Sequence, residues 1–432
     1  MRGLLFILAG TAAWAGEPAA WKFRFGSAAA GWTAVAPTDT YSAAKGYGFD
    51  LGLGVVAVDR GQGGSPGSQF VTSDRPFCFS VSVPEGNYRV TVVFGDAAGE
   101  STATVKAESR RLMLENVQAK AGACVSRTFI VNVRNSRLPP PPKNAPGGDR
   151  VILNDREHEV LHWDDKLTLE FDGSRACLDS LEIARADDVP TLFLAGDSTV
   201  TDQPREPAAS WGQMLPRFFK PTVAVANHAE SGETLKSFIA ELRLAKILSQ
   251  IKRGDYLLMQ FGHNDEKQSW PQTYVDARTT YRAYLRVFIA EARLRGATPV
   301  LVTPVQRRQF DPDGRIRNSH GDFPEAMREV AREEQVALID LERMSRAFYE
   351  ALGPEKAPLA FSAEGRDPTH HDDYGAYELA KCVAQAIRAD HLPLAGAIIE
   401  DFPDFDPACP DAPESFHLQA SPFSSDERPR GN

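Results

Sequence analysis

The chain has 432 residues, of which 42% are hydrophobic and 25% are charged, and its formal net charge is -10. This length predicts two or three domains, and the composition is typical of a globular protein. An acidic chain without a basic stripe is not expected to bind nucleic acid or an anionic membrane surface. No run reaches the roughly 18 apolar residues that a membrane span requires, so stable membrane insertion is not expected either.

The N-terminus has the order of an export signal. Arg2 is followed by an apolar stretch and then by an Ala-Trp-Ala cleavage pattern that ends at Ala15. We therefore expect residues 1–15 to be a signal peptide and the mature protein to be secreted or periplasmic. The alternative interpretation of this stretch is a first core strand.

Five cysteines are present: Cys78, Cys124, Cys177, Cys382 and Cys409. Export to an oxidising compartment makes disulfides possible, with Cys382 and Cys409 as one plausible pair and two of the other three as a second. Buried free thiols are the open alternative, because cysteine is often a small core residue.

Residues 16–186 are predicted to form an all-β domain. Alternating or β-branched runs lie at residues 77–83, 88–94, 129–133, 167–171 and 178–185. Short strands at this spacing, with turn residues between them, predict a β-sandwich. Residues 138–148 contain four consecutive prolines and are expected to be an exposed loop.

The pattern changes twice beyond the β domain. In residues 190–397, apolar runs alternate with stretches of helical period, which predicts a parallel sheet with helices on both faces. The predicted strands are residues 191–195, 222–226, 256–261, 299–303 and 336–339, and the predicted helices are 237–251, 281–292 and 376–387. The order of the strands is not readable from this pattern. Residues 398–432, rich in proline and acids, are predicted to pack as extended chain or to be disordered.

Polar residues follow several of these strands where they end. Gly196-Asp197-Ser198 ends the first strand, and Gly232 and Asn264 lie in short stretches after two others. Open α/β folds place their ligand sites at the carboxyl ends of parallel strands, so we expect these groups to meet at one edge of the sheet. Asp367 and His370 are three residues apart, so one local turn can bring both to that edge.

These residue types are the ones that acyl transfer needs. A serine hydroxyl becomes a nucleophile when a histidine takes its proton, and a carboxylate orients that histidine and stabilises its cation. The developing oxyanion needs fixed donors, which the N–H groups of Ser198 and Gly232 and the side-chain amide of Asn264 could supply. His371 competes with His370 for the role of base, but the spacing from Asp367 favours His370.

The arrangement resembles the SGNH (GDSL-type) hydrolases over about residues 191–388. The matching residues are Ser198 in GDS, Gly232 in NHAESG, Asn264 in GHND, and Asp367 and His370 in DPTH. FGHND and DPTHHDDYGA look like the rhamnogalacturonan acetylesterase branch. In that branch an N-terminal β-sandwich similar to galactose-binding-like domains often precedes the catalytic domain, and GYGFD at residues 46–50 looks like a signature of that module.

This resemblance implies a flavodoxin-like three-layer α/β/α hydrolase domain after an all-β sandwich domain. It implies Ser198 as nucleophile, His370 as base with Asp367 as its partner, and an oxyanion hole formed by Ser198, Gly232 and Asn264. No metal or cofactor is implied, and the clustered residues 370–373, HHDD, lack the further ligands of zinc sites. One departure follows Gly232, where Glu233 stands in place of the arginine expected in this branch.

A basic loop after the fourth strand contains Arg307 and Arg308, and Arg366 stands beside the Asp/His pair. Solvated surface arginines are one interpretation. The other is that these three guanidinium groups bind uronate carboxylates of an acidic polysaccharide.

The leading functional hypothesis is an exported serine esterase that releases acetate from a plant cell-wall polysaccharide, in particular acetylated rhamnogalacturonan (pectin). The alternatives are another SGNH ester hydrolase, such as a xylan acetylesterase or a lipase-like enzyme, and a non-catalytic polysaccharide-binding protein. A glycosidase with paired carboxylates is a third alternative, but the sequence indicates no such pair.

Overall fold

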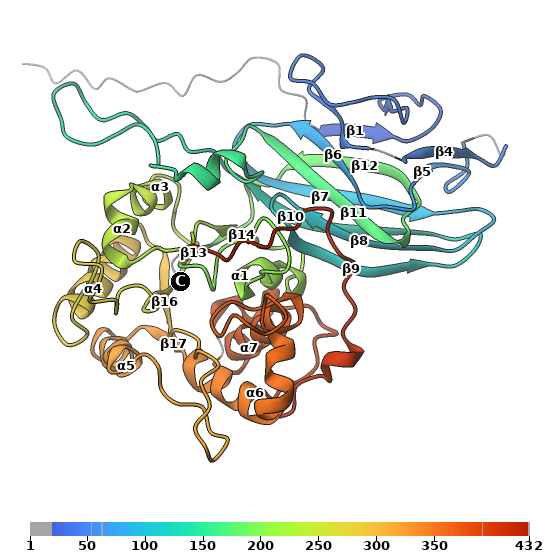
Figure 1. The fold of residues 1–432 in the computed structure, drawn as a ribbon. Helices are drawn as coiled ribbons and strands as arrows, with labels where there is room; N and C mark the ends of the chain where they lie inside the picture. The colour runs from blue at the N-terminus through green and yellow to red at the C-terminus, as the bar shows by residue number, and fades with distance from the viewer. Residues whose placement is uncertain (1–19, 53, 62–63, 391, 431–432) are drawn as a thin grey trace, which may run out of the picture.

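The computed structural model describes residues 20–52, 54–61, 64–390 and 392–430, which form a β-sandwich, an α/β domain and a C-terminal tail (Figure 1). The predicted signal peptide lies outside the described residues. Within them, no helix is both long enough and apolar enough to cross a membrane.

The sandwich consists of two sheets whose strands are antiparallel apart from the β1/β2 pair. One sheet has the order β10-β7-β12-β1-β2, with β5 on β12 and β4 on β5, and the other has the order β3-β6-β11-β8-β9. The strands are β1 (Ala20–Arg24), β2 (Thr33–Ala34), β3 (Tyr47–Leu51), β4 (Val56–Asp59), β5 (Gln69–Thr72), β6 (Phe77–Ser82), β7 (Gly86–Gly95), β8 (Ser101–Ala107), β9 (Arg111–Ala119), β10 (Cys124–Val133), β11 (Lys166–Arg175) and β12 (Leu178–Arg185). The predicted sandwich is therefore confirmed.

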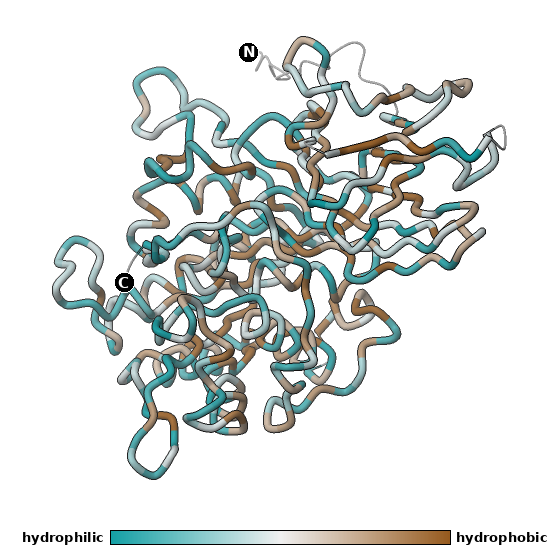
Figure 2. The backbone as a smooth tube through the Cα atoms, turned by 45° about the vertical axis from the view of Figure 1, so that its right-hand side comes forward, coloured by the Kyte–Doolittle hydropathy of each residue, from teal (hydrophilic) through white to brown (hydrophobic). Residues whose placement is uncertain are grey.

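Alternate residues of the two sheets form the sandwich core. Phe77 and Phe79 of β6 face Val92 and Phe94 of β7 in one buried apolar cluster, and the rings of Phe77 and Phe171 stack with centroids 5.2 Å apart. Because β6 and β7 belong to different sheets, the predicted turn between them carries the chain across the sandwich. In Figure 2 many strongly hydrophobic backbone segments lie inside, and the loops at the edge are mixed, with long hydrophilic stretches.

The α/β domain contains five parallel strands: β13 (Thr191–Gly196), β14 (Ala224–Asn227), β15 (Tyr256–Gln260), β16 (Thr298–Val302) and β17 (Ala337–Ile339). Their order is β14-β13-β15-β16-β17, which is the flavodoxin-like order. The strand order reverses around β13, and this is where such sheets open a crevice for a ligand. Ser198 follows β13 directly.

Two layers of helices cover the sheet, and side chains alternate along β13 to meet them. Leu192 and Leu194 pack against α1, α6 and α7, and Phe193 and Ala195 pack against α2 to α5. The helices are α1 (Trp211–Met214), α2 (Leu235–Ala240), α3 (Arg243–Leu248), α4 (Thr280–Leu294), α5 (Phe323–Glu334), α6 (Leu341–Lys356) and α7 (Asp373–Ala389). The three-layer α/β/α prediction is confirmed.

The single helix predicted over residues 237–251 is wrong, because the structure has two helices there, α2 and α3. The break lies at Leu242, whose φ of 62° is left-handed. The turn carries Arg243 inward, where its fully buried guanidinium meets Glu157 of the connection between the domains. The apolar spacing continues across the break, so periodicity alone could not reveal it.

All five thiols are free, so the suggested Cys382–Cys409 disulfide is not formed. Cys382 points from α7 into the apolar core, whereas Cys409 is exposed in the tail. The alternative of buried free thiols describes Cys78, Cys177 and Cys382, and Cys124 and Cys409 are exposed.

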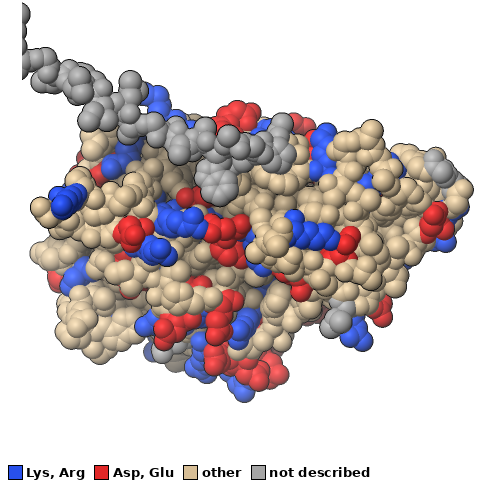
Figure 3. Space-filling view, turned by 90° about the horizontal axis from the view of Figure 1, so that it is seen from above, with Lys and Arg blue, Asp and Glu red and all other residues tan. Residues whose placement is uncertain are grey.

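The sandwich packs against the β14 edge of the parallel sheet. Ile130 of β10 and Ala224 of β14 belong to a small apolar cluster at this junction. Beside it, Arg111 of β9 donates to Asp202 at 2.8 Å, and both side chains are fully buried. On the outer face seen in Figure 3, acidic and basic side chains are interspersed. By contrast, the Arg111–Asp202 pair at the junction lies inside the molecule, where it helps to fix how the domains meet.

Close packing at the start of α7 gives a test of the fold. A Cβ at Gly375 would clash with the carbonyl of Ala360, whereas one at the exposed Gly396 would meet nothing. We expect Gly375→Ala to lower the free energy of unfolding by about 1–3 kcal/mol, as overpacking does. Gly396→Ala should match wild type in denaturant unfolding, and equal stabilities for both variants would contradict this packing.

Candidate active site

Ser198 lies in a tight turn at the carboxyl end of β13. The carbonyl of Asp197 accepts from the N–H groups of Val200 and Thr201 at 3.0 and 3.1 Å, and its side chain accepts from Thr199 N–H. Gln203 donates to the carbonyl of Ser198 at 2.8 Å. These bonds hold the backbone of the turn and leave the Ser198 hydroxyl for other contacts.

The structure brings Ser198, His370 and Asp367 into one hydrogen-bonded chain. Ser198 Oγ lies 2.8 Å from His370 Nε2, and His370 Nδ1 lies 2.9 Å from Asp367 Oδ2. A carboxylate oxygen accepts, so Nδ1–H donates to Asp367 and Nε2 is left to accept from the Ser198 hydroxyl. The imidazole is therefore oriented as a base toward the hydroxyl.

Asp367 is held in its ionised form. Burial opposes ionisation, but the hydrogen bond and charge of His370 and the backbone N–H groups of Thr369 and His370 outweigh it and keep the pKa of Asp367 well below its ordinary range. A fixed carboxylate at this position can stabilise a protonated His370.

His371 faces away from this chain of groups. Its Nε2 lies 2.6 Å from the hydroxyl of Tyr349, and its ring packs on Phe361. Burial lowers the pKa of His371 to about 3, with the charge of His370 adding to the effect. Of the two adjacent histidines, His370 is therefore the one that contacts Ser198.

Three hydrogen-bond donors lie at the same sheet edge. Gly232 has a φ of 87°, a conformation that favours glycine. Its N–H and that of Ser198 have no hydrogen-bond partner in the described part of the chain. The amide of Asn264 donates one hydrogen to the carbonyl of Glu233 at 3.1 Å, which leaves the second available.

Buried ion pairs hold the loop that contains Gly232. Arg156, from the 3-10 helix Asp155–Glu159 between the domains, donates to Glu230, which precedes Gly232 by two residues. On the other side, Arg243 Nε lies 3.2 Å from Glu233, and Arg243 also donates to Glu157 at 2.6 Å. Sequence reasoning missed Arg156 and Arg243, because nothing local links them to Gly232.

The structure separates the three arginines that were predicted to bind substrate. Arg307 is paired with Glu266 at 2.6 Å and is only 14% exposed. Arg308 donates to the carbonyl of Gly365 and lies over the ring of Phe361. Arg366 is 72% exposed, lies 3.8 Å from the exposed Glu364, and donates from Nε to the carbonyl of Ala363 at 2.9 Å.

Among the described residues, one group of three side chains has the spacing of a metal site: Glu157, His162 and Glu230. Arg243 and Arg156 already pair with its two carboxylates, and nearby guanidinium charge opposes a further cation. The HHDD side chains diverge, because Asp372 caps α7 and Asp373 pairs with Arg110 of the sandwich.

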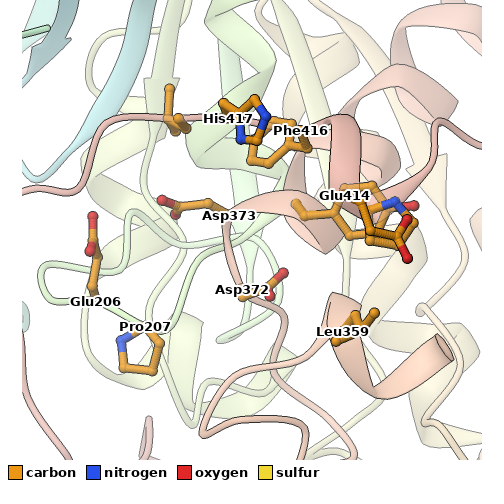
Figure 4. A pocket seen from close by; sticks show the side chains of 11 residues that line it. Glu206, Pro207, Leu359, Asp372, Asp373, Glu414, Phe416 and His417 are labelled. Atoms are coloured by element: carbon orange, nitrogen blue, oxygen red, sulfur yellow. The ribbon is translucent and has the colours of Figure 1, made fainter. Parts of the chain in front are cut away.

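A separate hollow, shown in Figure 4, lies beside the start of α7 and is bounded by Glu206, Asp373 and the tail residues Phe416 and His417. Its volume is about 510 Å³. No predicted site residue lines it, so it is not part of the group around Ser198.

Comparisons with known proteins place both domains in known families. The GDSL-like Lipase/Acylhydrolase family model matches residues 194–376. A model described as Beta-agarase/YXIM esterase-like, galactose-binding domain-like, matches residues 21–137. The first covers the α/β domain, and the second covers much of the sandwich.

Individual relatives match one or both domains. The chain is 42% identical over 221 residues to rhamnogalacturonan acetylesterase RhgT of Bacillus subtilis (strain 168), covering 48% of this chain and 94% of that protein. It is 28% identical over 389 residues to the uncharacterized esterase YxiM of the same organism, covering 87% and 92%. The crystal structure of YxiM from Bacillus subtilis has a TM-score of 0.47 at 26% identity, covering 87% of this chain and 99% of that chain.

A buried carboxyl next to Asn264 predicts a pH dependence of stability. Burial raises the pKa of Asp265 to about 8, from an ordinary value of 3.8. The folded state therefore keeps a proton that the unfolded chain releases, so stability should fall as pH rises between about 4 and 8.

We expect Asp265→Asn to flatten the decline of the melting temperature between about pH 5 and 8, because the amide does not titrate. The control is Asp187→Asn, at an acid that is 69% exposed, which should follow the wild-type profile. An Asp265→Asn profile parallel to wild type would show that Asp265 does not hold this proton.

Proposed function

Because the chain belongs to the GDSL-like lipase/acylhydrolase family, we propose that it is an exported serine esterase that removes O-acetyl groups from acetylated rhamnogalacturonan, a plant cell-wall polysaccharide. The observation that carries the proposal is the 2.8 Å contact between Ser198 Oγ and His370 Nε2, with Asp367 behind the imidazole. The name of the relative RhgT supports the choice of substrate. The order of the N-terminal residues supports export.

In the proposed reaction, His370 Nε2 takes the hydroxyl proton of Ser198 while Ser198 Oγ attacks the acetyl carbonyl carbon. The negative charge on the carbonyl oxygen is stabilised by the N–H groups of Ser198 and Gly232 and by the free hydrogen of the Asn264 amide. His370 then gives its proton to the departing sugar hydroxyl. Ser198 is left as an acetyl ester.

Water completes the cycle by the same steps. His370 takes a proton from the attacking water, acetate leaves, and the proton returns to Ser198. Asp367 stays ionised throughout, because its contacts with His370 and the neighbouring N–H groups favour the charged form. Ser198 is only 4% exposed, which suits a small acyl group such as acetyl.

Recognition of the polysaccharide requires groups outside the reacting centre. We propose that Arg366, which is exposed beside the Asp/His pair, contacts a substrate carboxylate. The roles predicted for Arg307 and Arg308 stay predictions, and their present contacts with Glu266 and Gly365 would compete with a substrate carboxylate.

Acetate release from acetylated rhamnogalacturonan, with acetylated xylan as comparison, tests the proposal. We expect Ser198→Ala to lower kcat on the order of 10⁴-fold or more, because the nucleophile is lost. The control is Ser126→Ala, at an exposed serine of β10 in the sandwich domain. Wild-type protein that released no acetate from any acetylated polysaccharide would contradict the proposed function.

The proposed oxyanion contact of Asn264 has its own test. Asn264→Ala should lower kcat for a nitrophenyl acetate about 10²- to 10³-fold and leave KM nearly unchanged, because the lost bond is made mainly in the transition state. A variant with wild-type kcat would remove Asn264 from the oxyanion hole.

A further inference from the structure

The C-terminal tail, residues 419–430, is fixed to both domains. Lys106 of the sandwich donates to the carbonyl of Gln419 at 2.8 Å, and Ser421 donates to Glu170 at 2.9 Å. In the α/β domain, Glu206 N–H donates to the carbonyl of Phe423 at 2.9 Å, and Ser425 N–H donates back to Glu206 at 2.8 Å. In Figure 1 the dark red tail crosses from the β9 side over β10 and β14 toward β13.

The last described residues of the tail reach the loop of Gly232. Pro429 is buried in a hollow that Gln203 and Arg205 also line. One residue further, Arg430 Cγ lies 3.7 Å from the position that a Cβ on Gly232 would occupy. Arg430 is thus held beside a proposed oxyanion donor by the buried proline and by the bonds upstream.

Arg430 lines a hollow of about 330 Å³ together with Gly232 and the half-buried ring of Trp270. Asn154, Ser231 and Thr273 add polar groups to its wall. The wall therefore combines an aromatic face, short polar side chains and a guanidinium, contributed by the domain connection, the α/β domain and the tail. An apolar or aromatic wall with a few placed polar groups is typical of a small-molecule subsite.

The charges around this hollow leave Arg430 as the group available to an anion. The two acidic residues that line the hollow, Glu233 and Glu241, both contact Arg243, at 3.2 and 3.0 Å. Lys267 lies over the ring of Trp270, 4.3 Å from its centroid, and donates to Asn264. No ion pair of Arg430 is found within the described residues.

We infer that this hollow is a subsite for a uronic-acid residue of the substrate chain, in which Arg430 binds the sugar carboxylate and the ring of Trp270 faces the sugar. The inference rests on the proposed function, since it extends the same site along the polysaccharide. A planar guanidinium matches a carboxylate with two parallel N–H···O bonds, which gives it the geometry for this role. It also explains how a chain of net charge -10 meets an acidic polymer.

Binding is tested without catalysis in full-length Ser198→Ala protein, by calorimetric titration with unacetylated oligogalacturonate and with neutral xylo-oligosaccharide. Adding Arg430→Ala should weaken oligogalacturonate binding about five- to tenfold and leave xylo-oligosaccharide binding unchanged. Arg430→Lys should fall between them, because it keeps the charge but loses the paired bonds. The matched control is Arg332→Ala, at an exposed arginine of α5.

Equal oligogalacturonate affinity with and without Arg430, or no binding by the parent protein, would overturn the subsite. Equal melting temperatures of the variants show that a loss of binding is not a loss of folding. The proposed function fails separately, when wild-type protein releases no acetate although Arg430-dependent binding is present. Acetate release with no Arg430 dependence on either polymer would overturn the subsite alone.

Discussion

The loop of Gly232 depends on buried ion pairs that cross between the domains. Arg156 and Glu157 come from the connection after the sandwich, and they meet Glu230 and Arg243 of the α/β domain in positions where Arg243 and both carboxylates are almost fully buried. A buried charge that loses its partner costs several kcal/mol, so these pairs favour one arrangement strongly over others. The backbone N–H of Gly232 is thereby set in place from outside its own domain.

This dependence gives the sandwich a structural part in the site. Besides the ion pairs, Arg111 reaches Asp202 in the segment after Ser198, and Arg110 reaches Asp373 at the start of α7. The segments of Ser198, Gly232 and the Asp367/His370 pair thus each have a charge contact with the N-terminal half of the chain.

Much of the architecture could be predicted from local pattern. The apolar strands of both domains and the edge position of Ser198 follow from residue period and turn residues, and the Asp367–His370 spacing is itself local. The break at Leu242 could not be predicted, because it arises from the burial of Arg243 against Glu157, 86 residues away in sequence. The pairing of Arg307 with Glu266 and the arrival of Arg430 at Gly232 are likewise products of the fold, since no sequence period couples such distant positions.

The path of the tail has a consequence for biogenesis. Residues 419–430 leave the ribosome after every group that they touch, and domains generally fold in order from the N-terminus. The sandwich and the parallel sheet can therefore fold first, and the extended segment from Gln419 to Arg430 packs across both of them afterwards. A translation product that ended shortly before Gln419 would have Ser198, His370 and Asp367 in place but would lack the segment that brings Arg430 beside Gly232.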